Sequence, residues 1–160
     1  YKTTMETIKY SKKPIIATHT FCRAVYNHPR GKSDEEIKYL AKKGGVIGIS
    51  INPAFFIRKE KISINDFLNH IDHAVQIAGI KHVGIGTDWD CTLPSSIANY
   101  FDKLAINKKW YDWRKKVEGY RDARDWLNII RGLVSRGYKD NEIKAIIGGN
   151  FLRIFKEVVG

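Results

Sequence analysis

The sequence predicts an α/β fold in which parallel strands alternate with helices, and three observations support this. Three short runs, 14–18, 46–50 and 83–86, are almost continuously apolar or small, which is typical of strands covered on both faces. Helical patterns separate these runs at a repeat of roughly thirty residues, the length of a right-handed crossover in a parallel sheet. The 160 residues, 43% apolar and 28% charged, have the composition of an ordinary globular domain.

Local signals place the helices between the strands. Ser33 and Glu36 form an S-x-x-E capping box, and Gly44 stands where a left-handed residue ends the helix. The pattern over 63–78 predicts a second helix. Apolar residues then recur at helical spacing after residue 120, and Asn150 is predicted to cap the last helix.

The composition excludes several classes of protein. No run of about 18 apolar residues is present, so no membrane-spanning helix is expected. The two cysteines, Cys22 and Cys91, form no C-x-x-C motif, which argues against a zinc ribbon or a thioredoxin-type site. The sequence does not fix a compartment, and the cytoplasm is our default expectation.

The formal net charge of +11 raises the question of an anionic partner. Segment 103–124 holds eight Lys and Arg residues with aromatic residues among them, a composition typical of surfaces that bind single-stranded nucleic acid. A solvated helix with its aromatic side chains turned inward explains the same pattern, and we favour it. A basic nucleic-acid-binding α/β module is therefore the alternative hypothesis, and nucleic acid is not the expected partner.

Candidate functional residues follow the predicted strands, where ligands of parallel α/β sheets bind. His19 follows the first strand and Asp88 the third, and imidazole and carboxylate groups suit zinc binding or proton transfer. Arg30 lies in the loop after the first strand, and its planar fork suits a carboxylate or a phosphate. Each also has a structural explanation: a hydrogen-bonded His, a turn-capping Asp, a surface Arg. For His70 and His73, one turn apart on the second helix, we favour hydrogen bonds at the core edge over metal binding.

Several separate motifs, in one order and spacing, resemble the renal (membrane) dipeptidase family of zinc metallopeptidases. The likeness covers about residues 9–159 and is weakest over 92–120. The matching stretches are PIIATHT, RAV and HPR within 14–30, GGVIG at 44–48, HIDH at 70–73, VGIGTDWD at 83–90, RGY at 136–138 and GGNFLR at 148–153.

The resemblance implies a (β/α)8 TIM-barrel metallo-hydrolase that holds two zinc ions and cleaves dipeptides. His19 is then a ligand of one zinc ion, Arg30 binds the free carboxylate of the substrate, and Asp88 faces its amino end and moves a proton. A zinc pair of this kind activates a bridging hydroxide and polarises the peptide carbonyl.

The sequence also departs from the family pattern. The other metal ligands of the family, an H-x-D motif, a bridging Glu and a second His, precede the matched region and cannot be placed in these 160 residues. About 250 residues are typical of such a barrel, and three strands cannot close one. We therefore expect residues 1–160 to be the C-terminal portion of the barrel, three strands plus the C-terminal helices.

Further expectations follow for this portion and for the parent protein. Alone, it should be inactive and retain no zinc, and its open sheet edges should lead to self-association, with a homodimer as one form. A catalytically dead, dipeptidase-like scaffold is the remaining alternative for the parent protein. Gly31 stands where the family has Asn, and Cys91 where it has Gly, so loop geometry at both positions is open.

Overall fold

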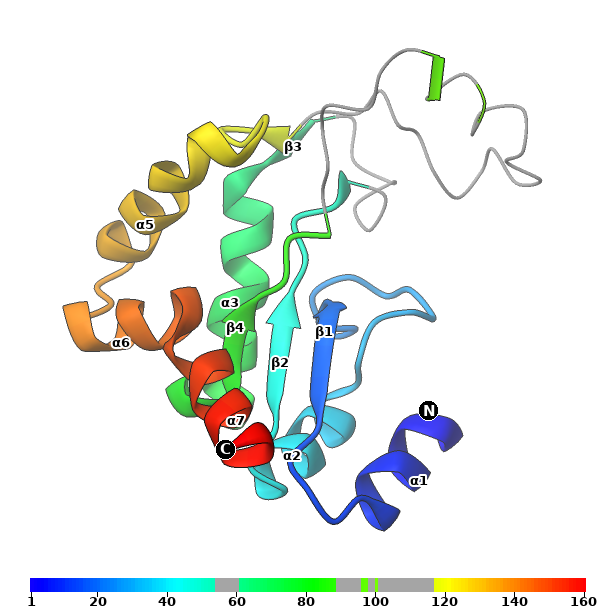
Figure 1. Cartoon of the computed structure of the whole chain (residues 1–160). Coiled ribbons are helices and arrows are strands. Elements are labelled where there is room, and N and C mark those ends of the chain that lie inside the picture. Colours follow the sequence, from blue (N-terminus) through cyan, green and yellow to red (C-terminus); the bar gives the residue numbers. More distant parts are fainter. Residues whose placement is uncertain (54–60, 89–95, 98–99, 101–116) are drawn as a thin grey trace.

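A computed structural model describes residues 1–53, 61–88, 96–97, 100 and 117–160 (Figure 1). Helices and short strands alternate through the first half of the chain, and helices dominate the second half. The main elements are α1 Lys2–Tyr10, β1 Ile16–Thr20, α2 Asp34–Lys42, β2 Val46–Ile49, β3 Ile62–Ser63, α3 Ile64–Ala78, β4 Val83–Ile85, β5 Val117–Glu118, α5 Trp126–Ser135, α6 Asp140–Lys144 and α7 Asn150–Val159, with a π-helical turn at Ala145–Gly149.

The predicted parallel sheet is confirmed. Strands β1, β2 and β4 pair in that order, with Ile16 opposite Val46 and Ile47 opposite Val83. The central strand β2 is buried along its whole length, which explains its unbroken apolar sequence. The first strand begins two residues later than predicted and runs to Thr20, so His19 lies within the strand rather than after it.

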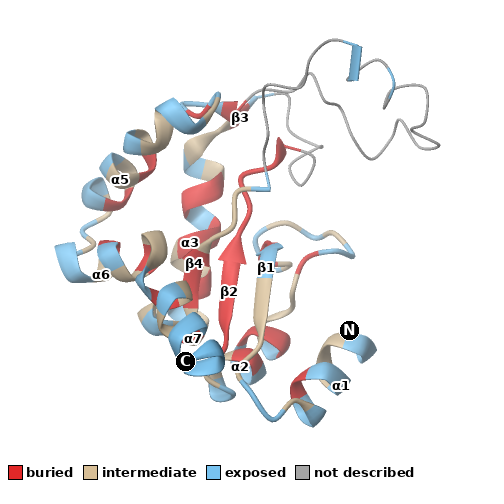
Figure 2. Cartoon of the chain, viewed as in Figure 1, coloured by how far each residue is buried: buried red, intermediate tan, exposed pale blue. Residues whose placement is uncertain are grey.

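The two faces of the sheet differ in what covers them. Ile47 and Ile49 belong to the main hydrophobic core, which includes residues of α2, α3 and α5 (Figure 2). Gly48 alternates with them and so lies on the opposite face, where the Phe151 ring of α7 lies against Gly48 and Gly84. The core therefore lies on the face of the sheet that carries Ile47 and Ile49. On the opposite face, the glycines have no side chain, so backbone atoms and the Phe151 ring can approach closely.

Most of the predicted helix boundaries are confirmed. The backbone N–H of Ser33 donates to Glu36 Oε2 at 2.9 Å, and the N–H of Glu36 donates to Ser33 Oγ at 3.2 Å, which completes the capping box. Gly44 ends α2 with a φ of +77°. The cap predicted for Asn150 is wrong, because its buried side chain donates to the carbonyls of Ile80 and Val83, both at 2.7 Å. Asn150 thus ties the start of α7 to the start of β4.

The fold class is mixed α/β with parallel strands. A second pair of parallel strands, β3 and β5, has two residues in each strand. Within the described ranges, the main sheet has three strands and does not close on itself. No helix of this part of the chain is long and apolar enough to cross a membrane.

Candidate active site at the carboxyl edge of the sheet

His19 is placed by an irregularity in β1. Between Ala17 and Thr20 the strand carries one residue more than its partner β2, so Thr18 and His19 together face Gly48 in the manner of a β-bulge. The imidazole is exposed, and its Nδ1 lies 2.8 Å from Thr18 Oγ1. That hydrogen bond orients the ring and leaves Nε2 as the nitrogen on which a ligand would be held.

Asp88 lies where the chain leaves β4, and Asn52 holds it there. Its backbone has a left-handed φ of +48°, a conformation that Asp tolerates better than most residues. Asn52 is only 4% exposed, and its Nδ2 donates to the Asp88 carbonyl at 2.9 Å and to Oδ2 at 3.3 Å. The exposed Asp88 carboxylate therefore has one oxygen directed towards a buried amide.

The segment that follows β2 joins the ends of all three strands. The N–H of Ser50 donates to the carbonyl of Thr20 at 2.8 Å, and the Ser50 hydroxyl donates to the carbonyl of Thr87 at 2.9 Å. The sheet thus brings His19 and Asp88 to one edge, both exposed. This is the arrangement that the order of the strands predicts.

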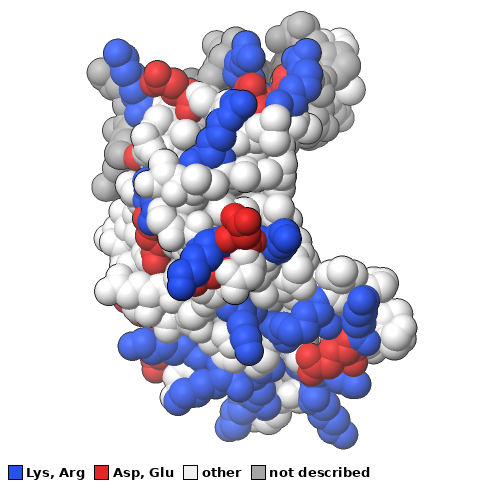
Figure 3. Space-filling model, turned by 90° about the vertical axis from the view of Figure 1, so that its left-hand side faces the viewer, with Lys and Arg blue, Asp and Glu red and all other residues white. Residues whose placement is uncertain are grey.

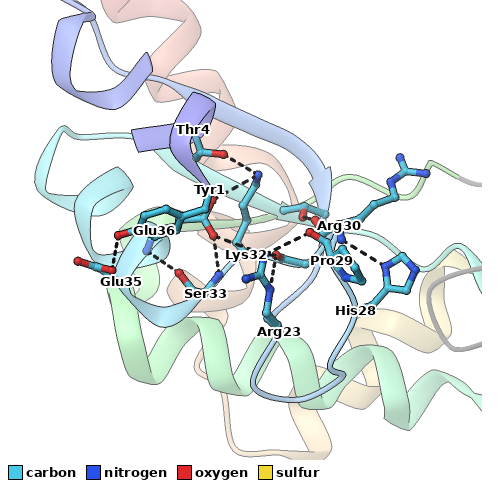
Figure 4. Close-up of polar contacts among 12 residues, drawn as sticks. Tyr1, Thr4, Arg23, His28, Pro29, Arg30, Lys32, Ser33, Glu35 and Glu36 are labelled. Atoms are coloured by element: carbon cyan, nitrogen blue, oxygen red, sulfur yellow. Dashed lines mark hydrogen bonds and ion pairs between the residues drawn. The ribbon is translucent and has the colours of Figure 1, made fainter. Parts of the chain in front are cut away.

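Arg30 lies beside the same edge on the loop after β1. The Thr20 hydroxyl donates to the Arg30 carbonyl at 3.3 Å, and the Arg30 N–H donates to His28 Nδ1 at 3.3 Å. The Arg30 side chain is exposed and points away from these backbone contacts (Figure 4). The loop holds the Arg30 backbone inward while its guanidinium extends outward.

Gly31, where the family pattern has Asn, fits this loop closely. A Cβ at Gly31 would lie 2.7 Å from Cε2 of the buried Phe21 ring and 3.2 Å from the Cα of Arg23. The Phe21 ring thus fills the space that a side chain at position 31 would need. Gly31 in place of the Asn of the family pattern therefore allows the Phe21 ring to pack directly against the loop backbone.

The two histidines of α3 make hydrogen bonds within the fold, the interpretation that the sequence favours. His70 is buried and its Nδ1 accepts from the N–H of Cys22 at 3.2 Å, while His73 Nε2 lies 2.7 Å from Asp34 Oδ1 at the start of α2. Burial raises the pKa of the Cys22 thiol to about 12, which keeps it protonated and unreactive at neutral pH. These contacts attach α3 to the loop after β1 and to α2.

The described ranges do not by themselves form a metal centre. Within 1–53, 61–88, 96–97, 100 and 117–160, no group of three His, Cys, Asp or Glu side chains could hold a metal ion. His19, the predicted zinc ligand, is not part of such a group there. The two-zinc centre that the sequence resemblance implies therefore needs ligands besides those that this part of the chain supplies.

Two residues that hold the candidate site had no assigned role from sequence. Arg23 belongs to the RAV motif, and Asn52 follows β2 outside the matching motifs. The sequence shows only an amide side chain three residues after the end of β2 and an arginine within a short loop. Neither position indicates a partner in the sequence. Asn52 binds the carbonyl of Asp88, which is distant in sequence, and Arg23 binds carbonyls whose direction the folded loop determines.

The basic segment gives little support to nucleic-acid binding where it is described. Residues 101–116 lie outside the described ranges, as do Asp90 and Cys91. In the described remainder, Arg121 pairs with Asp125 at 3.1 Å and Arg124 with Asp122 at 2.5 Å.

On the face drawn in Figure 3, Lys and Arg gather towards the lower end, where Figure 1 places α2 and α7. That positive charge lies near the start of the strands, away from the edge with His19.

A parallel α/β sheet with exposed His, Asp and Arg side chains near its carboxyl edge defines an α/β protein with a candidate ligand site at that edge. The family model described as membrane dipeptidase (peptidase family M19) matches residues 1–100 and 96–159. The chain therefore belongs to this family of metallo-dipeptidases, as the motifs predicted.

Known proteins resemble the chain over nearly its whole length. The chain is 30% identical over 152 residues to dipeptidase verJ of Clonostachys rogersoniana, covering 92% of this chain and 32% of that protein. An amidohydrolase from Pseudomonas aeruginosa superposes with a TM-score of 0.84 at 29% identity, over 98% of this chain and 49% of that one. A metallopeptidase from Rhodobacter sphaeroides, solved with a phosphinate mimic of the dipeptide L-Ala-D-Ala, shares the fold with a TM-score of 0.75 at 18% identity, over 96% of this chain and 38% of that one. The chain thus spans about a third to a half of the length of these relatives.

Proposed function

We propose that this chain is the C-terminal portion of a (β/α)8-barrel zinc dipeptidase, and that it supplies the part of the site that recognises the substrate. The observation that carries the proposal is the convergence of three strand ends on segment 50–52, with His19 and Asp88 exposed at that edge. Family membership supports the reaction class, and the short coverage of longer relatives supports the proposed place in a larger barrel.

The proposed roles follow from the chemistry of a dipeptide, which carries a carboxylate at one end and an ammonium group at the other. The exposed guanidinium of Arg30 presents a planar fork that matches a carboxylate. Asp88 presents a carboxylate suited to the ammonium group and to carrying a proton towards the leaving amine. Fixed opposite charges of this kind favour substrates of dipeptide length with both ends free.

His19 is the proposed zinc ligand of this chain. Thr18 engages its Nδ1, and a partner on one ring nitrogen commonly orients a histidine that binds metal through the other. When bound, zinc in such a site activates water and polarises the peptide carbonyl. Because the described residues hold no group of three His, Cys, Asp or Glu side chains that could bind a metal ion, we propose that the 160 residues alone bind no zinc pair and hydrolyse no dipeptide.

The test compares the 160-residue chain with a longer protein that contains it. Zinc content and hydrolysis of a simple dipeptide such as L-Ala-L-Ala are measured in both. We expect zinc and turnover in the longer protein alone. Stoichiometric zinc with turnover in the 160-residue chain would refute the partial-barrel proposal, and loss of both in the longer protein would favour the scaffold alternative.

Substitutions in the longer protein test the residue roles. Asp88→Asn should lower kcat by about 100-fold or more, as expected for loss of an acid–base group. Asp140→Asn, an exposed carboxylate on α6, is the matched control and should leave kcat unchanged. Arg30→Ala should weaken binding of dipeptides with a free carboxylate and leave amidated analogues unaffected. Equal losses on both substrates would remove Arg30 from carboxylate recognition.

A further inference from the structure

We propose that Arg23 is a positioning residue that holds the loop 28–31, so that Arg30 extends towards the substrate carboxylate. This inference rests on the proposed function of Arg30. Arg23 fixes the backbone of the loop, and the Arg30 side chain extends from that backbone.

The contacts of Arg23 converge on the carbonyls that flank Arg30 (Figure 4). Its Nε donates to the Gly31 carbonyl at 3.1 Å, and its Nη2 donates to the Gly31 carbonyl at 2.8 Å and to the Pro29 carbonyl at 3.2 Å. The carbonyl of Arg30 itself accepts from the Thr20 hydroxyl. Three consecutive carbonyls are thus bound by groups of the protein, two of them by one cationic fork.

The backbone closes the same loop at its base. The N–H of Arg23 donates to the Lys32 carbonyl at 2.8 Å, and the N–H of Lys32 donates to the Phe21 carbonyl at 2.8 Å. These two hydrogen bonds join the start and the end of the loop but do not reach its tip. The Arg23 side chain reaches from the base of the loop to the carbonyls of Gly31 and Pro29, and so ties the tip to the base.

The Arg23 side chain also forms an ion pair with a residue of α2. Its Nη2 lies 4.0 Å from Oε2 of Glu36, whose side chain is only 1% exposed. Lys32 Nζ lies 3.7 Å from the other oxygen of Glu36 and donates to Thr4 Oγ1 at 3.0 Å. Because Glu36 also completes the capping box of α2, the loop is attached to a helix terminus that the core fixes. A guanidinium meets two carbonyls and a carboxylate at once, which a lysine ammonium on a flexible stem cannot reproduce.

The first experiment needs no enzymatic activity. Amide hydrogen exchange is measured in the 160-residue chain for wild type, Arg23→Gln and Arg23→Lys. Arg131→Gln is the matched control, because Arg131 is exposed and donates to Asn128 on α5. Both Arg23 variants should speed exchange of the Gly31 N–H, which donates to the His28 carbonyl, by about tenfold or more, while the amides of α3 are unchanged. Unchanged exchange over 28–31, or equal acceleration in α3, would overturn the proposal.

The second experiment uses the longer, active protein. Arg23→Gln should raise KM for a dipeptide with a free carboxylate by about tenfold, with kcat changed by about twofold at most. The amidated analogue should show no change, and Arg23→Gln should add nothing in an Arg30→Ala background. An equal KM change for the amidated analogue, or an additive effect in that background, would overturn the positioning role. If the wild-type protein hydrolyses no dipeptide, the proposed function fails, and hydrogen exchange still decides whether Arg23 holds the loop.

Discussion

Gly86, the residue after β4, lies directly against the carbonyl oxygen of Thr18 in β1, although β2 separates these two strands in the sheet. A Cβ added at Gly86 would overlap that oxygen and lie 3.4 Å from the Cα of His19. A Cβ at Gly48 would overlap the same oxygen. The bulge that carries His19 therefore rests on two glycines, and the second of these lies two residues before Asp88.

The first prediction is that Gly86→Ala displaces the bulge and with it His19. Backbone blocks the added methyl group, so rotation of a side chain cannot relieve the overlap, and we expect a loss of about 1–3 kcal/mol in the free energy of unfolding. The ring resonances of His19 should shift in NMR spectra. Gly148→Ala is the matched control, because a Cβ there meets no atom within 4 Å. Equal stability of the two variants would contradict the close approach.

The sequence predicted the order of strands and helices because the relevant signals are local. The Ser33 and Glu36 side chains bind the backbone of their own helix turn, and β2 is buried on both faces, so each signal lies within a few residues. The extent of β1 could not be predicted in the same way. Its bulge at Thr18 and His19 depends on room left by Gly48 and Gly86, which are distant in sequence.

For the candidate site, the sequence predicted which strand ends carry polar groups. The supporting contacts were not, because they join residues far apart in sequence or depend on loop conformation. Asn52 binds Asp88 across 36 positions, and Arg23 binds carbonyls whose direction only the folded loop sets. Asn150 shows the same limit, since its side chain spans to Ile80 and Val83 instead of capping its own helix.

The second prediction is that the 160-residue chain self-associates. In the described part of the chain, β1 lies at an edge of the sheet, and an apolar groove of about 790 Å³ lies between the segment entering β1 and α7. Ile15 and Ile16 line it on one side, and exposed Leu152 and Phe155 on the other. An unpaired edge beside exposed apolar side chains favours pairing with a second copy.

Light scattering over a range of concentrations measures this self-association. The weight-average mass should rise above 18.4 kDa with concentration. The double substitution Leu152→Lys and Phe155→Lys should lower it, because both side chains are exposed on α7. A constant monomer mass for the unsubstituted chain at every concentration would rule the interaction out.

The third prediction concerns Glu36 and the acid stability of the chain. Burial alone raises the pKa of Glu36, but hydrogen bonds from Ser33 and Thr4 and the charge of Lys32 outweigh it, so its pKa lies below the usual range. A carboxyl group whose pKa is lowered in the folded state stabilises the fold above the pKa of the unfolded chain, about 4.3. That stabilisation is lost as the pH falls from there through the lowered folded-state pKa.

Urea unfolding of wild type and Glu36→Gln at a series of pH values tests this. Near pH 7 the variant should be less stable by about 1.5–3 kcal/mol, since it loses the charged partner of Ser33, Lys32 and Arg23. Below about pH 4 the difference should shrink, because the wild-type carboxylate becomes protonated. Glu6→Gln, an exposed change on α1, should follow the wild-type pH dependence. A stability gap for Glu36→Gln that stays constant down to pH 2 would show that packing, and not the charge of Glu36, is what the substitution removes.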